Sequence, residues 1–261
     1  MESHRTETPR DRLRIFSRTD WQMPLGDRAA LEAVVAQIRP AIAIEIGTAQ
    51  GGSLERIALH SGEVHAFDLT GEGLDGLPEN ASFHEGDSRE TLSAVLERIA
   101  ADGGVVEFAL VDGDHSRAGV RADLEALLGS PACRGTVILL HDAFNAAVRD
   151  GIRDALAEAE DVVDSDLDLT SGRRFGGGPL AGQLWGGFAI VLAGPAEATR
   201  PLPVVAGQIP GLGEVEYAFE DSHATLGGGE ASLRRELEEI HSSASWRLTA
   251  PLRALRRRAG R

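Results

Sequence analysis

The chain has 261 residues, of which 42% are hydrophobic, with one cysteine and a formal net charge of −15. This length suffices for one α/β core with extensions. Cys133 alone excludes an internal disulfide and a cysteine-based zinc site, and the acidic balance argues against general nucleic-acid binding.

Hydrophobic periodicity predicts alternating strands and helices. After an N-terminal arm (residues 1–25), a helical pattern through Leu31 and Val35 ends at Pro40. Strands are predicted at 41–46, 64–68, 81–84, 105–111 and 136–140, helices at 53–60, 89–101, 118–128 and 143–159, and two closing strands at 162–169 and 184–192. The alternation predicts a doubly wound, Rossmann-like α/β fold. Its seven-stranded, mostly parallel sheet is expected in the order 3-2-1-4-5-7-6.

The predicted domain spans residues 26–194, and two segments follow it. Residues 195–228 are rich in proline and glycine and predict a linker or a wrapping segment. Residues 229–261 predict an amphipathic helix and a basic tail. This tail interleaves Trp246 with leucine and arginine, which suits either peripheral membrane contact or a disordered tail. With no apolar run near the ~18 residues of a membrane span and no signal-peptide pattern, a cytoplasmic protein is expected.

The turn after the first strand carries the cofactor signal. Gly47, Gly51 and Gly52 open a helix, and Asp68 ends the next strand, where its carboxylate can take ribose hydroxyls. This layout is typical of a nucleoside-binding unit. The glycine spacing differs from that of dinucleotide sites, so it favours S-adenosylmethionine over NAD. A tight turn without a ligand is the alternative.

Asp87 follows the third strand. Its carboxylate can accept a hydrogen bond from an adenine amino group, cap the following helix, or do both.

Acids and histidines follow the fourth and fifth strands: Asp112, Asp114 and His115 after one, His141 and Asp142 after the other. Because ligands gather at the carboxyl ends of parallel strands, we expect these side chains to converge. Carboxylates in one cleft repel each other unless a proton or a cation neutralises them. The donor types suit Mg²⁺ or a similar ion, beside which a neutral histidine could act as a base. Helix capping by the aspartates is the alternative.

A family resemblance adds to what these residues indicate. The segment 45–53 resembles the first motif of class I S-adenosylmethionine methyltransferases of the catechol and caffeoyl-CoA type. The segments 111–116 and 140–142 are similar to a bacterial branch that includes macrocin-type sugar O-methyltransferases and proteins labelled cephalosporin hydroxylase. The resemblance spans about residues 28–193, and the C-terminal tail resembles those of surface-polysaccharide enzymes. It implies an S-adenosylmethionine-dependent O-methyltransferase acting on a hydroxyl of a sugar or glycan precursor.

The resemblance also implies residue roles. Asp112, His141 and Asp142 match the ligands of a divalent cation, although the family usually has an acid where His141 stands. His115 occupies the position of the family's catalytic lysine and is the expected base, with His141 as second candidate. The expected cofactor contacts are Glu45, Gly47, Thr48, Gly51, Gly52, Ser53, Asp68, Asp87 and Asp112.

Two other functions remain open: a non-catalytic nucleoside-binding scaffold in a glycan-biosynthesis complex, and an NAD-dependent oxidoreductase. A small-molecule or glycan acceptor is the expected partner, nucleic acid is not, and a homo-oligomer is allowed. Arg173 and Arg174 lie in a glycine-rich connection. They either grip a phosphate or carboxylate of the acceptor or form a solvated pair.

Overall fold

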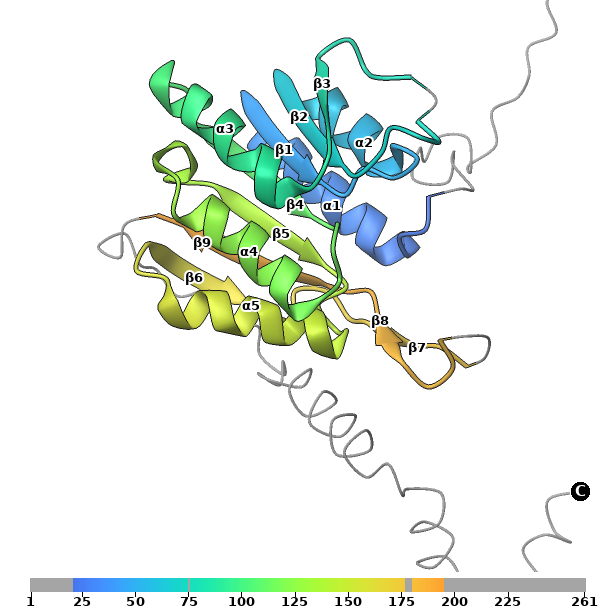
Figure 1. Ribbon diagram of the computed structural model, residues 1–261. Coiled ribbons are helices and arrows are strands. Elements are labelled where there is room, and N and C mark those ends of the chain that lie inside the picture. Colours follow the sequence, from blue (N-terminus) through green and yellow to red (C-terminus); the bar gives the residue numbers. More distant parts are fainter. Residues whose placement is uncertain (1–20, 75, 177–179, 195–261) are drawn as a thin grey trace, which may run out of the picture. The chain divides into compact units, whose positions relative to one another are not determined.

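The computed structural model describes residues 21–74, 76–176 and 180–194 (Figure 1). Most of the predicted N-terminal arm, the predicted linker and the predicted tail lie outside these residues. Within the described part, no helix has the length and apolar character needed to cross a membrane.

Seven strands form one sheet in the order β3-β2-β1-β4-β5-β9-β6. The strands are β1 (Ile42–Ile46), β2 (Glu63–Asp68), β3 (Ala81–Glu85), β4 (Val106–Val111), β5 (Val137–His141), β6 (Val162–Asp166) and β9 (Phe188–Ala193). The first five strands in this order, β3, β2, β1, β4 and β5, are parallel. Strand β9 is antiparallel to both of its neighbours, β5 and β6. The predicted fold class and strand order are therefore confirmed.

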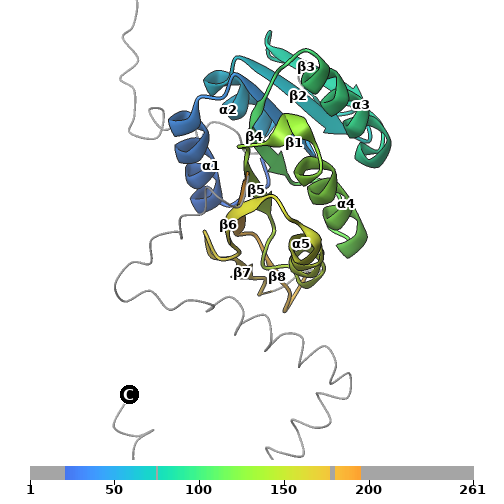
Figure 2. The same ribbon diagram turned by 90° about the vertical axis from the view of Figure 1, so that its left-hand side faces the viewer.

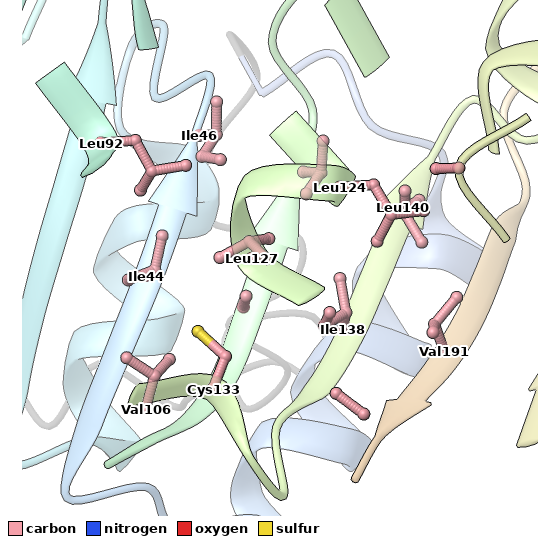
Figure 3. Packing of buried hydrophobic residues seen from close by; sticks show 14 of the residues in the cluster. Ile44, Ile46, Leu92, Val106, Leu124, Leu127, Cys133, Ile138, Leu140 and Val191 are labelled. Carbon is pink, nitrogen blue, oxygen red and sulfur yellow. The ribbon is translucent and has the colours of Figure 1, made fainter. Parts of the chain in front are cut away.

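Five α-helices of the described residues cover the two faces of the sheet. They are α1 (Leu25–Ile38), α2 (Gly52–His60), α3 (Ser88–Ala101), α4 (Arg117–Leu128) and α5 (Ala146–Glu158), and a short 3₁₀ turn covers Pro131–Cys133. Figure 2 shows α1 and α2 on one face and α3, α4 and α5 on the other. The β-strand alternation sends Ile44 and Ile46 toward the face with α3 and α4, where they meet Leu92 and Leu124 (Figure 3).

The last predicted strand is divided in two. Gly186 and Gly187 have φ angles of +76° and +75°, so the chain turns between β8 (Leu184–Trp185) and β9. A Cβ on Gly187 would lie 2.6 Å from the Phe144 ring. β8 leaves the main sheet and pairs with β7 (Arg173–Arg174) as a two-stranded ribbon.

Two predicted boundaries also change. The helix expected from residue 143 begins at Ala146, because the Asn145 side chain accepts hydrogen bonds from the N–H groups of Ala147 and Val148. The strand expected over 162–169 ends at Asp166.

A buried arginine connects α5 to the chain after β6. Arg149 has no exposed surface. Its guanidinium donates to the carbonyl oxygens of Ala143 and Leu167, each at 3.2 Å, and to Asp168 Oδ1 at 2.9 Å. Since these contacts hold the segment that leads to β7, they also fix one side of the site described below.

Replacing Arg149 by methionine should lower the free energy of unfolding by about 3–5 kcal/mol, because Asp168 and two carbonyl groups lose their buried donor. Urea denaturation followed by circular dichroism measures the loss. Arg153→Met on the same helix is the control and should lower stability much less, as its side chain is 38% exposed and its ion pair with Asp150 is 3.9 Å long. Equal effects of both changes would contradict the structural role of Arg149.

Glu45 is a fully buried acid in the central strand β1. Neither carboxylate oxygen has a hydrogen-bond partner in the described part of the chain. Burial raises the pKa of Glu45 to about 8. The nearby hydroxyls of Ser53 and Thr48 oppose this rise in pKa, and the negative charges of Asp112 and Asp68 add to it. The folded protein therefore holds a proton on Glu45 at pH values where the unfolded chain has lost it.

Stability should accordingly fall as pH rises from about 4.5 to about 8, because the folded state binds more protons than the unfolded state in this window. We expect Glu45→Gln to raise the melting temperature of the ligand-free protein at pH 8 and to change it little near pH 4.5. Differential scanning calorimetry at both pH values measures the effect, with the exposed Glu55→Gln as control. A wild-type advantage at pH 8 would contradict this account of Glu45.

Candidate active site

The turn between β1 and α2 brings three strand ends together. Gly47 has φ +91°, and a Cβ there would lie 2.2 Å from the Asp112 carbonyl oxygen at the end of β4. Its N–H donates to the Phe67 carbonyl in β2 at 2.8 Å. Ala49 donates to Asp68 Oδ2 at 2.7 Å, with its own φ at +45°. Only glycine at position 47 allows this close approach of β1 to β4.

One pocket of about 470 Å³ lies over the ends of β1, β2, β3 and β4. We call it the β2-side pocket. Asp68, Asp87 and Ser88 line it beside the ends of β2 and β3, and Gly47, Asp112 and His115 line it beside the ends of β1 and β4. The structure therefore places Asp68 at the end of β2, as predicted, in the lining of a pocket beside the glycine turn.

Asp87 caps a helix. Its Oδ1 accepts from the Arg89 N–H at 3.0 Å, and its carboxylate forms an ion pair with the Arg89 guanidinium. Hydrogen bonding to Arg89 lowers the pKa of Asp87 to about 2. The predicted helix cap is confirmed, whereas the contact with adenine stays a prediction.

Four of the five predicted cluster residues converge at the ends of β4 and β5. His115 Nε2 lies 2.9 Å from Asp142 Oδ2 and 3.6 Å from Asp112 Oδ1. His141 Nδ1 lies 3.0 Å from Asp112 Oδ1 and 3.5 Å from Asp142 Oδ2. Asp112, His115 and Asp142 offer ligand atoms within 4.8 Å of one another, a spacing that could hold a metal ion.

Asp114, the fifth predicted member, serves the backbone instead. Its two carboxylate oxygens accept from the N–H and the hydroxyl of Ser116, at 2.8 and 2.9 Å. Ser116 in turn caps α4 by accepting from the Gly119 N–H at 3.0 Å. The predicted alternative, helix capping by Asp114, is therefore wrong: Ser116 is the capping residue of α4, and Asp114 holds Ser116 in place.

The clustered charges perturb one another. Contacts with Asp112 and Asp142 raise the pKa of His115 to about 9. Burial opposes the ionised form of Asp142, yet His115 and His141 lower its pKa. Nevertheless, His115 Nε2 makes no hydrogen bond of acceptable geometry in the described part of the chain, although it is buried. A protonated His115 therefore supplies a positive charge beside the two carboxylates, in a place that a bound cation could also take.

Asp27, in the first turn of α1, is a partner that the sequence patterns did not predict. It is 2% exposed, and its Oδ2 lies 3.3 Å from His141 Nε2. Thr170 Oγ1 donates to its Oδ1 at 2.7 Å, and the Gly187 N–H donates to its Oδ2 at 3.0 Å. Burial works against the charged carboxylate, but His141 and these donors lower its pKa overall. Both ring nitrogens of His141 therefore face carboxylates, and the ring is fixed between them.

The backbone of Asp142 supports this arrangement. Asp142 has φ +56°, a left-handed conformation that non-glycine residues seldom adopt. The Gly186 N–H donates to its Oδ1, which leaves Oδ2 directed at His115. Backbone strain of this kind is typical of functional sites.

A second pocket, of about 330 Å³, lies on the other side of the cluster. We call it the β5-side pocket. Trp21, Met23, Phe175, Leu180 and Trp185 form apolar walls, and Asp112, His115, His141 and Asp142 form the acidic side. Trp21 packs so tightly on the turn between β1 and α2 that a Cβ on Gly52 would lie 2.5 Å from the indole. The two pockets share Gly47, Ala49, Asp112 and His115 as lining residues.

The other predicted contact residues occupy different places around this turn. Thr48, Gly52 and Ser53 line the β5-side pocket. Gly51 is the residue before α2, with φ +79°. It lines neither of the two pockets, nor does Glu45. Trp21 and Trp185 were not predicted to belong to the site.

Comparison with known proteins supports the class of domain. Residues 44–143 match a family model described as a methyltransferase domain. No curated protein gives a significant match. Among solved structures, the O-methyltransferase TomG from Streptomyces achromogenes, in complex with SAM, has a TM-score of 0.50 at 16% identity, over 69% of this chain and 85% of that one.

Two further solved structures are similar over shorter parts of this chain. The O-methyltransferase from Bacillus cereus, in complex with SAH, has a TM-score of 0.45 at 18% identity, over 62% of this chain and 79% of that one. The N-methyltransferase NodS from Bradyrhizobium japonicum WM9, in complex with S-adenosylhomocysteine, has a TM-score of 0.46 at 14% identity, over 66% and 89%. The narrower resemblance to a bacterial sugar-methyltransferase branch stays a prediction. The match covers residues 44–143, and at this level the predicted class of enzyme, a methyltransferase, is confirmed.

Proposed function

We propose that the protein is an S-adenosylmethionine-dependent O-methyltransferase that methylates a hydroxyl of a sugar or glycan precursor with the help of a divalent cation. The observation that carries this proposal is the pair of adjoining pockets with Gly47, Asp112 and His115 in their shared wall. A methyl donor in one pocket and an acceptor in the other would meet at that wall.

The β2-side pocket fits the nucleoside half of the donor. Asp68 keeps one oxygen bonded to the turn through Ala49, and its other oxygen can accept from ribose hydroxyls. Asp87 lines the far part of this pocket, where an adenine ring would lie. Thr48, Gly52 and Ser53, which line the neighbouring pocket, suit the methionine half. Glu45 is fully buried and lines neither pocket, so its contact with the cofactor stays a prediction.

The acidic cleft fits a hard divalent cation. In this proposal Asp112 and Asp142 would hold the ion, whose preferred ligands are oxygens. His141 lies 3.0 Å from Asp112 Oδ1 and is held by Asp27 on its other side. We therefore assign to His141 the orientation of Asp112 rather than the expected role of a metal ligand. When bound, the cation would supply Lewis acidity to the acceptor hydroxyl.

His115 is the proposed base, and its Nε2 faces both carboxylates from the shared wall. When bound, S-adenosylmethionine supplies a methyl group on a positively charged sulfur. The acceptor oxygen would take this methyl group, and the sulfur would leave as a neutral thioether with the electron pair of the broken carbon–sulfur bond. Because Asp112 and Asp142 raise the pKa of His115 to about 9, His115 can act as the base only when a cation bound by those carboxylates leaves its imidazole neutral. The hydroxyl proton would then pass to His115 Nε2, so that charge and atoms balance.

The same proposal extends to location and assembly. It keeps the cytoplasm as the compartment and a glycan or small molecule as the partner. Peripheral membrane contact through the basic C-terminal tail and assembly into a homo-oligomer stay predictions, and the tail lies outside the described residues.

Isothermal titration with S-adenosylhomocysteine and, separately, with NAD tests the cofactor. We expect the full chain to bind the first and not the second. Asp68→Asn should weaken binding about tenfold to hundredfold, because a charged hydrogen bond to the ribose is lost. The exposed Asp102→Asn at the end of α3 is the control and should bind like wild type. Preference for NAD, or unchanged affinity in Asp68→Asn, would overturn the assignment.

Titration with Mn²⁺ alone, followed by electron paramagnetic resonance, tests the cation site without requiring the acceptor. The full chain should bind Mn²⁺, and Asp142→Asn should weaken binding at least about tenfold, since one of two charged ligands is lost. Asparagine tolerates the left-handed backbone of this position. Asp114→Asn is the matched control, because its carboxylate is engaged by Ser116. If both variants bind Mn²⁺ as wild type does, the ion lies elsewhere and the metal leaves the scheme.

A further inference from the structure

We propose that the acceptor carries an anionic group, a phosphate or a carboxylate, which Arg173 binds while Trp185 supports the body of the acceptor. This inference rests on the proposed function, because it names the chemical class of the molecule that fills the β5-side pocket. It concerns the ribbon of β7 and β8, which the assigned cofactor and cation contacts do not use.

The ribbon register directs Arg173 toward the pocket. Arg173 pairs with Trp185 across the antiparallel strands, and Arg174 pairs with Leu184. Side chains directly opposite each other share one face of a ribbon, and successive residues alternate between faces. Consistent with this, Arg173 and Trp185 line the pocket, and Arg174 is not among the lining residues.

Trp185 joins this face to the reacting groups. Its ring lies edge-on to the His115 imidazole, with the ring centroids 5.4 Å apart. The indole N–H donates to Gln183 Oε1 at 2.8 Å, which helps to fix the ring. An acceptor resting on this indole would therefore have one end at the His115 cluster and another end near Arg173.

The charge of the pocket explains why an arginine is useful there. Arg173 is the one arginine among the described residues that line it, and the chain contains no lysine. Asp112 and Asp142 lie in the same wall, and the whole chain carries a net charge of −15. A neutral acceptor would need no positively charged side chain to bind. The acidic groups would repel an anionic acceptor unless a nearby positive side chain bound it. The Arg173 guanidinium makes no hydrogen bond or ion pair with any residue that the structure describes, so its fork of donors is available.

Arg174 offers a matched control. It has the same charge, is exposed like Arg173, and donates to the Gly182 carbonyl at 3.1 Å. A general attraction of anions to this part of the surface would depend on both arginines. Recognition in the pocket should depend on Arg173 alone.

The test uses the full chain with three probes: glucose 1-phosphate, glucuronate and the neutral methyl glucoside. Their binding is measured by calorimetry with and without saturating S-adenosylhomocysteine. Wild type should bind at least one anionic sugar about tenfold or more tightly than the neutral one. Arg173→Gln should remove this preference, and Arg174→Gln should retain it. The phosphate and carboxylate arms show which anion the pocket selects.

Three results would overturn the inference: equal binding of neutral and anionic sugars by wild type, an unchanged preference in Arg173→Gln, or equal losses in both arginine variants. Failure of both anionic sugars to bind at millimolar concentration would also contradict it. Affinity for S-adenosylhomocysteine is measured in every variant. If that ligand binds and the anion preference is absent, the acceptor class alone is wrong. If it fails to bind wild type, the proposed function fails.

Discussion

Three carboxylates and two imidazoles share the carboxyl ends of β4 and β5, and the rest of the site depends on how their charges are balanced. Asp27 comes from α1, Asp112 follows β4 and Asp142 follows β5. His141 is held between the first two, with 3.3 and 3.0 Å contacts, and His115 faces the last at 2.9 Å. Because the Gly187 N–H also donates to Asp27, this one network joins α1, β4, β5 and the entry to β9. A positive charge between the carboxylates is therefore a structural as well as a chemical requirement.

The parallel sheet explains why this network lies beside a nucleoside-sized pocket. Gly47 lets the end of β1 approach the Asp112 backbone more closely than a side chain would allow. The turn that follows reaches Asp68 at the end of β2 through the Ala49 N–H. The turn after β1 therefore lies between a pocket that suits a methyl donor and a pocket that suits an acceptor, and His115 lines both pockets. In-line transfer needs such an arrangement, since donor and acceptor must approach the methyl carbon from opposite sides.

Much of this could be predicted from the sequence, for physical reasons. Strand and helix periodicity indicate the parallel sheet and its order, and parallel strands must bring Asp112 and Asp142 to one edge. Asp27 could not be predicted, because it lies in an ordinary helical pattern and reaches His141 only through tertiary packing. Trp185 was assigned to a continuous strand, since alternation does not reveal a break that depends on the positive φ angles of Gly186 and Gly187. Asp114 was expected either to join the cluster or to cap a helix; instead its carboxylate holds Ser116, and Ser116 caps α4.

A crystal structure of the full chain grown with S-adenosylhomocysteine and Mn²⁺ tests the central claim most directly. The account predicts an anomalous peak bound by Asp112 and Asp142, with the nucleoside ribose on Asp68 and the sulfur directed across the Gly47 turn toward the metal. A nucleoside outside the β2-side pocket, or a cation bound away from the Asp112–Asp142 cleft, would contradict it.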